Sequence, residues 1–439
     1  MGGSLTYTQL LQRNRPFRWF WSGQVISELG NWFNFIAALG LVRAVSNADP
    51  EVTTILLIAR LIPFTFFAPL AGVIVDRWSR RAVMIAADLL RVLAALGFLL
   101  VRRPEDLWIA YLCSVLLSIF GTFFEAAKNT AVPNITGERD MLAGHALMYS
   151  SRYLWMAIGS ALGGWTTAYI GFQAAFIINA LSYFVSAYSV WRVPEEETQK
   201  ETPEERPGYF ESYWSGIKAG WQYIVKHGPV ATIVVVTILY TIGSGPLNLI
   251  VDRLGALEFA SKSGISTDAA VAALYFAAAF GLFLGMMIAR VVGSYLESNQ
   301  RTVGFIGCGL ITQGILFALA GVMPGLLWSC VMVCLSRVFL GAHMAVQETL
   351  MMRLAPDDLR GRVSMIHHAG EILIAATFTG VAGWSLQWLT PRSLTVIAGL
   401  VSGTAGLAWL AVFLTRSVRL PKRLKGGMAE QEQPAAAGD

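Results

Sequence analysis

The sequence predicts an all-α, polytopic membrane protein in which twelve transmembrane helices form two pseudo-symmetric six-helix bundles. Three observations lead to this fold class. The 439-residue chain is 55% hydrophobic and 14% charged, whereas soluble domains average about a quarter charged residues. Apolar runs of about 20 residues, enough to cross a bilayer as a helix, recur along the chain. Short motifs of the first half also recur at a constant offset in the second half.

Twelve apolar segments are predicted as membrane helices, because a helix satisfies its own backbone hydrogen bonds in lipid. They lie near residues 17–44, 51–75, 80–101, 106–131, 142–168, 172–192, 229–251, 268–293, 301–322, 324–352, 363–388 and 393–415. This pattern divides the chain into an N-terminal bundle, a cytoplasmic linker with an amphipathic helix, a C-terminal bundle and a disordered cytoplasmic tail. These four regions comprise residues 1–192, 193–228, 229–416 and 417–439.

The linker begins with a stretch rich in glutamate and proline, which is typical of solvated chain. Its second part places apolar side chains at helical spacing, at Phe210, Trp214, Ile217, Trp221 and Ile224. This spacing predicts an amphipathic helix that lies on the membrane surface.

The positions of the basic residues predict the orientation. If the N-terminus is cytoplasmic, 23 of the 33 Lys and Arg residues fall in cytoplasmic segments, 6 fall outside and 4 lie within the spans. Cytoplasmic segments of membrane proteins are enriched in Lys and Arg. Both termini and the linker are therefore expected in the cytoplasm, and the net charge of +5 reflects this topology. We expect no nucleic-acid partner.

Two pairs of motifs indicate an internal duplication. The tripeptide Gly163–Trp165 corresponds to Ala382–Trp384. Glu138, in an acidic loop of the first half, corresponds to Asp357 in the second, and the offset is 219 residues in both pairs. Parallel repeats of this kind place a transporter's substrate site near the midplane, between the two halves.

The loop after the second predicted helix carries the pattern G-x-x-x-D-R-x-x-R-R, at Gly72, Asp76, Arg77, Arg80 and Arg81. The glycine permits close helix approach, the aspartate can accept hydrogen bonds at the start of a neighbouring helix, and arginines bind carboxylates. The pattern resembles motif A of the major facilitator superfamily. The resemblance implies a charged gating latch that closes the cytoplasmic side in one state; a contribution to topology alone is the alternative.

The fifth predicted helix contains Gly159, Ser160, Gly163 and Gly164. These residues partly resemble motif C of antiporters in the same superfamily, which has a proline where this chain has Ser160. Helix packing through small residues is the alternative interpretation.

A wider resemblance covers about residues 16–416 and rests on the segments Phe17–Trp32, Ala59–Arg77, Gly216–Pro229 and Leu359–Val363. These segments resemble the bacterial efflux branch that contains macrolide exporters and the enterobactin exporter. The resemblance implies a multi-pass protein of the bacterial inner membrane that exports amphipathic small molecules, such as drugs or siderophores, in exchange for protons. An importer or a lysolipid flippase with a different coupling ion is the alternative.

Gln24, Glu28 and Asn31 share one face of the first predicted helix, because they lie at positions i, i+4 and i+7. An ionisable group at the bilayer centre costs roughly 2.5–3.5 kcal/mol, so Glu28 should be paired, hydrated or functional. A carboxylate between two amides suits proton binding or the binding of a substrate amine. A structural polar cluster is the alternative.

Further charged residues lie within the predicted spans. Arg60 is expected to pair with an acid of the N-terminal half, whereas Arg337 and Glu371 are expected to face a cavity. His367 and His368 are neighbours, so we predict that they do not both face that cavity.

Two more candidates lie near the cytoplasmic ends of the spans. Glu125 and Lys128 are three residues apart, so a salt bridge between them is expected. Glu348 is expected to join a cytoplasmic polar network.

The chain lacks the motifs of other membrane-protein classes. It contains no HExxH or GxSxG, and no Gly-Lys dipeptide, which excludes a Walker A phosphate loop. We therefore expect neither an enzyme nor an ATP-driven pump, and no metal or cofactor. The expected partners are a small-molecule substrate, protons and the lipid bilayer.

Overall fold

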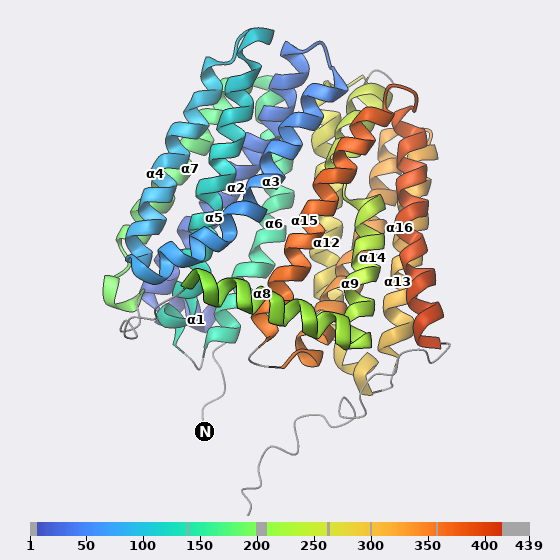
Figure 1. The fold of residues 1–439 in the computed structure, drawn as a ribbon. Coiled ribbons are helices and arrows are strands. Elements are labelled where there is room, and N and C mark those ends of the chain that lie inside the picture. The colour runs from blue at the N-terminus through green and yellow to red at the C-terminus, as the bar shows by residue number, and fades with distance from the viewer. Residues whose placement is uncertain are drawn as a thin grey trace, which may run out of the picture.

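The computed structural model describes residues 7–137, 140–198, 209–260, 264–298, 301–356 and 359–414, and these residues are almost entirely helical (Figure 1). The first half contains α1 (Tyr7–Arg13), α2 (Arg15–Val45), α3 (Pro50–Arg77), α4 (Arg80–Gly97), α5 (Leu107–Thr136), α6 (Met141–Tyr169) and α7 (Phe172–Trp191). After α8 (Tyr209–Lys226), the second half contains α9 (Gly228–Ser244), α10 (Leu247–Arg253), α12 (Thr267–Ser298), α13 (Thr302–Val322), α14 (Leu326–Leu354), α15 (Arg360–Ser385) and α16 (Pro391–Leu414). Short 3-10 turns occupy Phe98–Leu100, Pro104–Asp106 and Glu195–Glu197, and a π-helical turn, η4, occupies Leu254–Phe259. The predicted tail, residues 417–439, lies outside the described residues.

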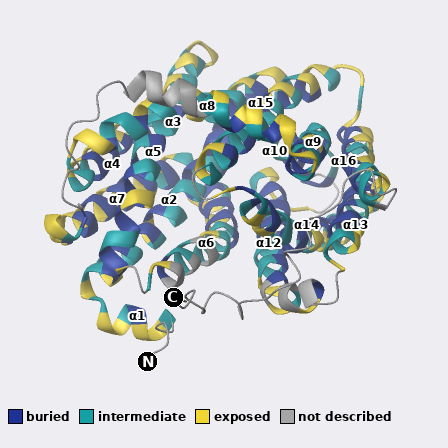
Figure 2. Ribbon diagram, turned by 60° about the horizontal axis from the view of Figure 1, so that its bottom comes forward, coloured by how far each residue is buried: buried dark blue, intermediate teal, exposed yellow. Residues whose placement is uncertain are grey.

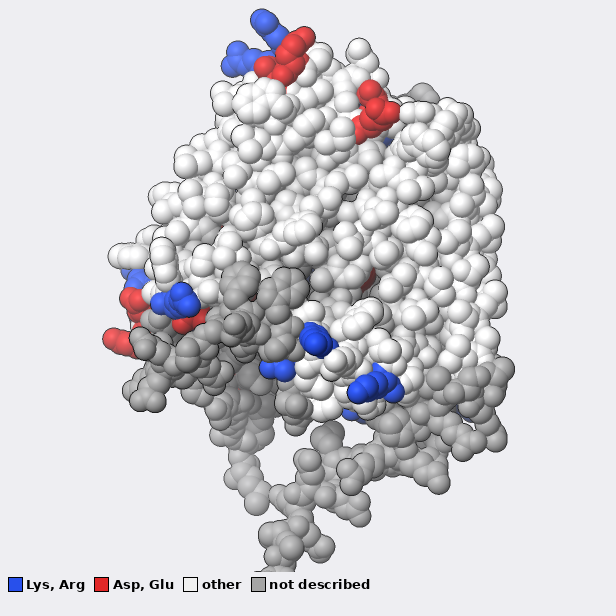
Figure 3. Space-filling view, viewed as in Figure 1, with Lys and Arg blue, Asp and Glu red and all other residues white. Residues whose placement is uncertain are grey.

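Ten helical segments of the described chain are long and apolar enough to cross a membrane. Figure 3 shows a broad belt with almost no charged side chains between the two ends of the visible face. Large apolar side chains are exposed, among them Leu93, Leu327 and Val291, which are 66%, 71% and 76% exposed. Exposed apolar surface of this extent is unusual in a soluble monomer. It is expected where a protein surface contacts the hydrocarbon chains of lipids.

Two long helices, α6 and α15, are not among these ten segments. They carry charged residues, including Arg152 in α6 and Glu371 in α15. Each of them packs against a helix of the other half, α6 against α12 and α15 against α3, as Figure 2 also shows. Charged groups within a membrane protein are tolerated where they face protein or a hydrated cavity, which explains the more polar composition of these two helices.

Capping residues and proline set several helix boundaries. Asn14, Asp49 and Ser79 precede α2, α3 and α4, and each side chain accepts a backbone N–H of the first turn. The segment predicted as one helix at 229–251 is instead interrupted at Gly245–Pro246 before it continues as α10 and η4. Proline has no backbone N–H to donate, so it weakens the helix at this point.

The helices run between two ends of the molecule. The end that carries α1 and the α3–α4 loop is called the terminal end here, and it lies at the bottom of Figure 1. The opposite end, which carries the α2–α3 loop and α10, is called the distal end.

The hydrophobic core differs between these two ends. At the distal end one core contains residues of both halves, including Phe33 and Ile36 of α2 and Leu274 of α12. At the terminal end there are two cores: one contains Phe20 and other residues of the first half, and the other contains Trp409 together with residues of the second half and α8. The two halves are therefore joined by apolar packing mainly at the distal end.

The amphipathic helix α8 packs on the second half. The Tyr223 hydroxyl donates a hydrogen bond to the Leu354 carbonyl oxygen at 2.7 Å, and Ile224 is buried in the core around Trp409. Trp221, which we grouped with Ile224, is 54% exposed. Figure 1 shows α8 running across the terminal end of the molecule. Along the chain it lies between α7 and α9 and so connects the two halves; its position on the membrane surface stays a prediction.

Candidate functional site

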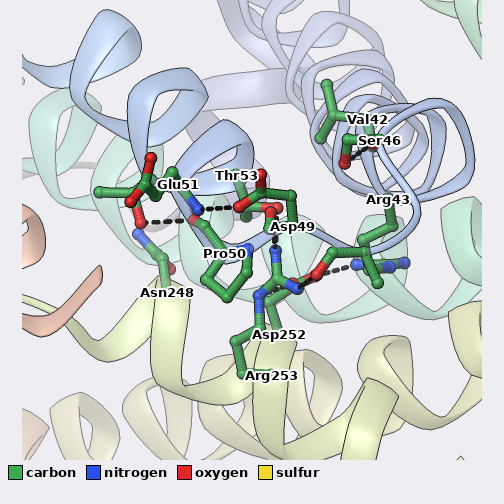
Figure 4. A network of polar contacts seen from close by, with 12 residues as sticks. Val42, Arg43, Ser46, Asp49, Pro50, Glu51, Thr53, Asn248, Asp252 and Arg253 are labelled. Atoms are coloured by element: carbon green, nitrogen blue, oxygen red, sulfur yellow. Dashed lines mark hydrogen bonds and ion pairs between the residues drawn. The ribbon is translucent and has the colours of Figure 1, made fainter. Parts of the chain in front are cut away.

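A buried ion-pair cluster joins the two halves at the distal end (Figure 4). Arg43, near the end of α2, contacts the carboxylates of Asp252 in α10 and Asp268 in α12. Arg43 is 6% exposed and Asp252 is fully buried. Ions removed from water lose hydration energy, and a close partner is what compensates for this loss. The cluster therefore favours contact between the halves at this end.

Arg253 makes a second link at the same end. Its guanidinium is fully buried and donates hydrogen bonds to the backbone carbonyl oxygens of Ala48 and Asp49, at 2.5 and 3.0 Å. It also contacts the Thr53 hydroxyl. The α2–α3 loop is thereby tied to the end of α10.

Sequence reasoning missed this cluster, because it counted Arg43 and Arg253 only as loop charges. A signal was present in the sequence. Few basic residues occur on the distal side, and Arg43 lies within the predicted segment 17–44. A charged residue inside an apolar segment requires a partner, which neighbouring sequence alone does not identify.

Two glycines lie where helices of opposite halves meet. A Cβ atom at Gly164 of α6 would lie 2.0 Å from the Cβ of Ala272 in α12. A Cβ atom at Gly383 of α15 would lie 2.2 Å from the Oγ1 of Thr54 in α3. The two glycines are 219 residues apart, so the two contacts occupy equivalent places in the repeats.

The other motif C positions face the first half. Cβ atoms at Gly159 and Gly163 would lie within 3.0 Å of α2, at Trp32 and Phe33. Ser160, in the position of the motif's proline, is buried and donates to a carbonyl oxygen of its own helix at 2.9 Å. These small residues allow α2 and α6 to approach closely.

The arginines of the α3–α4 loop bind residues of their own half. Arg80 donates to a carbonyl oxygen of α5 and, at 3.3 Å, to that of Thr198. Arg81 donates to the Trp191 carbonyl oxygen and lies 4.0 Å from the carboxylate of Glu195. These contacts of Arg80 and Arg81 are all made to residues of the first half.

The expected latch across the two halves is not formed in this structure. Asp76 and Arg77 are exposed, and neither side chain makes a hydrogen bond or ion pair with another described residue. Gly72 is half-buried. The physical reason lies in the cores: among the described residues the two halves have separate apolar cores at the terminal end, so apolar packing there does not hold Asp76 and Arg77 against the second half.

A pocket in the first half, the N-terminal pocket, is enclosed by α2, α5 and α6. Its empty volume is about 510 Å³, part of it open to solvent, and its polar lining includes Gln24, Glu28, Glu125, Lys128 and Arg152. Glu28 lies 3.8 Å from the guanidinium of Arg152. Lys128 donates to Glu125 at 2.5 Å, so the expected salt bridge forms. Gln24 donates weakly, at 3.4 Å, to a serine of α7.

Asn31 and Arg60 do not line this pocket. Asn31 accepts hydrogen bonds from Arg91 at 3.1 Å and from the Tyr183 hydroxyl. Arg60 donates to Asn34 and lies 5.2 Å from an aromatic ring centroid, so its partner is an amide and not the expected carboxylate. The shared face of α2 is therefore divided between the pocket and the neighbouring helices α4 and α7.

A second pocket, the C-terminal pocket, is enclosed by α9, α13, α14 and α15. Its empty volume is about 430 Å³, part of it open to solvent. Its titratable lining consists of Tyr240, His343, Glu348, His367, His368 and Glu371. Glu348, expected in a cytoplasmic network, thus lines a cavity together with Glu371.

The prediction that His367 and His368 do not both face the cavity is wrong. Both line the C-terminal pocket, because neighbouring helix positions can border one wide cavity from two sides. His367 is 6% exposed, whereas the His368 side chain is 45% exposed. Arg337 does not line the pocket; it is 1% exposed and lies 4.9 Å from the ring centroid of Phe317.

The two pockets occupy equivalent positions in the repeats. Arg152 of the N-terminal pocket and Glu371 of the C-terminal pocket are 219 residues apart. The same offset relates Asn129 to Glu348 in the two linings. Each repeat therefore contains a cavity at the equivalent position, and the two cavities are lined by different charged residues.

Comparison with known proteins agrees with this architecture. The chain is 25% identical over 397 residues to the uncharacterized MFS-type transporter YfiS of Bacillus subtilis, covering 87% of this chain and 91% of the relative. It is 20% identical over 375 residues to macrolide efflux protein A of Streptococcus pyogenes, covering 83% and 87%. A crystal structure of a POT family transporter in complex with a thioalcohol-conjugated peptide superposes with a TM-score of 0.70 at 12% identity, covering 91% and 96%.

The family profile matches most of the chain. The profile described as the Major Facilitator Superfamily aligns with residues 20–370, which include both pockets apart from Glu371, as well as the α3–α4 loop and the α6 glycines. Together with the helical fold, this match shows that the chain is a transporter and not an enzyme, and that it belongs to the Major Facilitator Superfamily.

Proposed function

We propose that the protein is a proton-coupled exporter that moves amphipathic small molecules out of the cytoplasm by alternating access. One observation carries this proposal. The two halves share an apolar core and buried ion pairs at the distal end, but they have separate cores at the terminal end. A transporter that is closed on one side and open on the other has this asymmetry.

The proposed arrangement in the membrane follows from the charge distribution. We assign the terminal end, with both termini and α8, to the cytoplasm of a bacterial cell, because most basic residues fall on that side. The helices α6 and α15 are proposed as the eleventh and twelfth spans, which completes two six-helix bundles in the inner membrane. With this orientation, the structure corresponds to an inward-open state.

In the opposite state the α3–α4 loop is proposed to act as the latch. Asp76 and Arg77 are exposed and available, and closing the terminal end would bring the second half toward them. The ion pairs of Arg43 would then break. The two ends thus hold charged contacts that compete, and the balance between them sets which side is open.

Glu28 is proposed as the proton carrier, with Gln24 beside it in the N-terminal pocket. Its side chain is 16% exposed and lies 3.8 Å from Arg152. Proton binding would remove the negative charge and weaken this attraction, so protonation and the position of α6 are coupled. Macrolide efflux protein A supports the outward direction and an amphipathic substrate.

Proteoliposomes with an imposed pH gradient test this proposal. Labelled erythromycin, a macrolide, is the probe. We expect the wild type to move it against its gradient when the proton gradient is imposed, and Glu28→Gln to retain exchange but lose the dependence on pH. Glu105→Gln, which alters an exposed distal carboxylate, is the matched control.

Two results would contradict the proposal. If erythromycin movement does not respond to the proton gradient in the wild type, proton-coupled export of such molecules is wrong. If Glu28→Gln retains the same pH dependence as the wild type, Glu28 is not the proton site.

A further inference from the structure

The two pockets differ in how their carboxylates are neutralised. In the N-terminal pocket, Glu28 faces Arg152 and Glu125 is paired with Lys128. The lining thus contains two carboxylates and two permanent cations. Because these charges balance, the N-terminal pocket does not attract a further cation from solution.

The C-terminal pocket lacks this compensation. It is lined by Glu348 and Glu371, and no Lys or Arg is found among the described residues that line it. Arg337 is 1% exposed and lies outside the lining. The two carboxylates thus have no permanent cation beside them in the described lining, and His368, which lies between them, is charged only when protonated. Opposite charges attract strongly where water is partly excluded.

The position of His368 shows where a cation would reach both carboxylates. Its Nε2 lies 3.7 Å from Glu348, and its Nδ1 lies 3.6 Å from Glu371. The two carboxylates therefore converge within 4 Å of one imidazole. The His368 side chain is 45% exposed, so it can move aside when another cation enters.

His343 supplies an observation independent of the acids. It lines the same pocket and is 2% exposed. Neither of its ring nitrogens has a hydrogen-bond partner among the described residues. A buried polar group without a hydrogen-bond partner is unfavourable, so a ligand that donates a hydrogen bond to the imidazole would remove this penalty.

We propose that the C-terminal pocket binds a protonated amino group of the transported molecule, with Glu348 and Glu371 as its counter-ions and His343 as a hydrogen-bond acceptor. This proposal rests on the proposed transport function and names its substrate class as amphipathic amines. An ammonium group carries three N–H donors and no acceptor, which matches a site of two carboxylates and one free imidazole. The apolar part of the ligand would contact Leu310, Leu340 and Met344, which also line the cavity.

Equilibrium binding to the purified full-length protein in detergent tests the proposal, with tryptamine and its uncharged analogue tryptophol as probes. The two molecules share the indole ring and differ in ammonium against hydroxyl. We expect tryptamine to bind at least about tenfold more tightly, equivalent to about 1.4 kcal/mol. The double variant Glu348→Gln/Glu371→Gln should bring the affinity ratio close to one, and His343→Leu should lower it partly.

The affinity ratio is measured on a single preparation, so partial unfolding of a variant affects both probes equally and leaves the ratio interpretable. Glu105→Gln should keep the wild-type ratio, because this carboxylate is exposed and outside both pockets. The proposal is wrong if tryptamine does not bind at millimolar concentration, if tryptophol binds equally well, or if the double variant keeps the preference.

The binding experiment tests the amine site and the liposome experiment tests proton-coupled export, so either proposal can be rejected without the other. A preference for tryptamine that depends on both carboxylates, without proton-driven transport in liposomes, would support the amine site and reject proton-coupled export. Proton-driven transport of erythromycin with no amine preference in binding would do the reverse.

Discussion

At the scale of single residues, contact between the halves depends on charges that have few other partners. Arg43 contacts carboxylates from two different helices of the second half and is almost completely buried. Removing one member of a buried ion pair leaves the other charge desolvated, which costs more than the pair contributes when intact.

Arg43→Ala is therefore expected to destabilise the protein by about 3–5 kcal/mol. The fully buried Asp252 would lose its contact with the Arg43 guanidinium. Thermal unfolding of purified protein in detergent measures the effect. Arg103→Ala removes an exposed arginine from the same end and should change stability by less than about 0.5 kcal/mol. Equal unfolding temperatures for the two variants would show that the distal cluster does not stabilise this state.

At the scale of elements, the interface between the halves includes two equivalent helix crossings, α6 with α12 and α15 with α3. Each crossing has a glycine, Gly164 or Gly383, at which an added Cβ would clash with the facing helix. The absence of a side chain at these glycines permits the close approach of the two helices, and the same helices α6 and α15 line the two pockets. A change at either glycine should therefore act on both packing and transport.

Gly164→Ala is expected to cost about 1–3 kcal/mol, as overpacking does elsewhere. The new Cβ would lie 2.0 Å from the Cβ of Ala272, and neither atom can rotate away. Gly121→Ala in α5 is the matched control, because no atom lies within 4 Å of its new Cβ. This control should be neutral or stabilising by up to about 1 kcal/mol, since alanine favours a helix over glycine. Thermal unfolding compares the two variants, and equal stability would contradict close packing at Gly164.

At the scale of the whole molecule, the two halves share one apolar core at the distal end and have separate apolar cores at the terminal end. Alternating access requires the distal contacts to open during each transport cycle. A covalent link across the distal end should therefore stop transport without unfolding the protein.

The pair Thr54→Cys and Gly383→Cys provides this link, in a chain whose four native cysteines are replaced by serine. A Cβ at Gly383 would lie 2.8 Å from the Thr54 Cβ, so the helices need to separate by about 1 Å for a relaxed disulfide. Oxidation should abolish transport in proteoliposomes, and a reductant should restore it. Thr54→Cys alone, treated with the same oxidant, should remain active. Continued transport by the fully cross-linked protein would refute movement at this crossing.

The structure also shows which parts of the site were predictable. Helical periodicity placed Gln24 and Glu28 on one face, and both line a pocket. Asn31 shares that face along the helix but bonds Arg91 and Tyr183. Helical periodicity predicts the direction in which a side chain leaves its own helix. The partner of that side chain depends on which neighbouring helix lies opposite it, and the periodicity does not contain this information. For the same reason, the amide partner of Arg60 could not be predicted.

The helical membrane fold, the superfamily and the positions of the repeat were predictable from the amino-acid sequence, because apolar composition, short motifs and a constant offset are properties of the chain. The end at which the two halves share one apolar core, and the charges that meet there, became evident from the three-dimensional packing. Arg43 and Asp252 are 209 residues apart, and their contact arises from helix packing that no local pattern encodes. Arg152 and Glu371 occupy equivalent repeat positions and carry opposite charges, which the sequence already shows. That each of them lines a pocket was evident only from the structure.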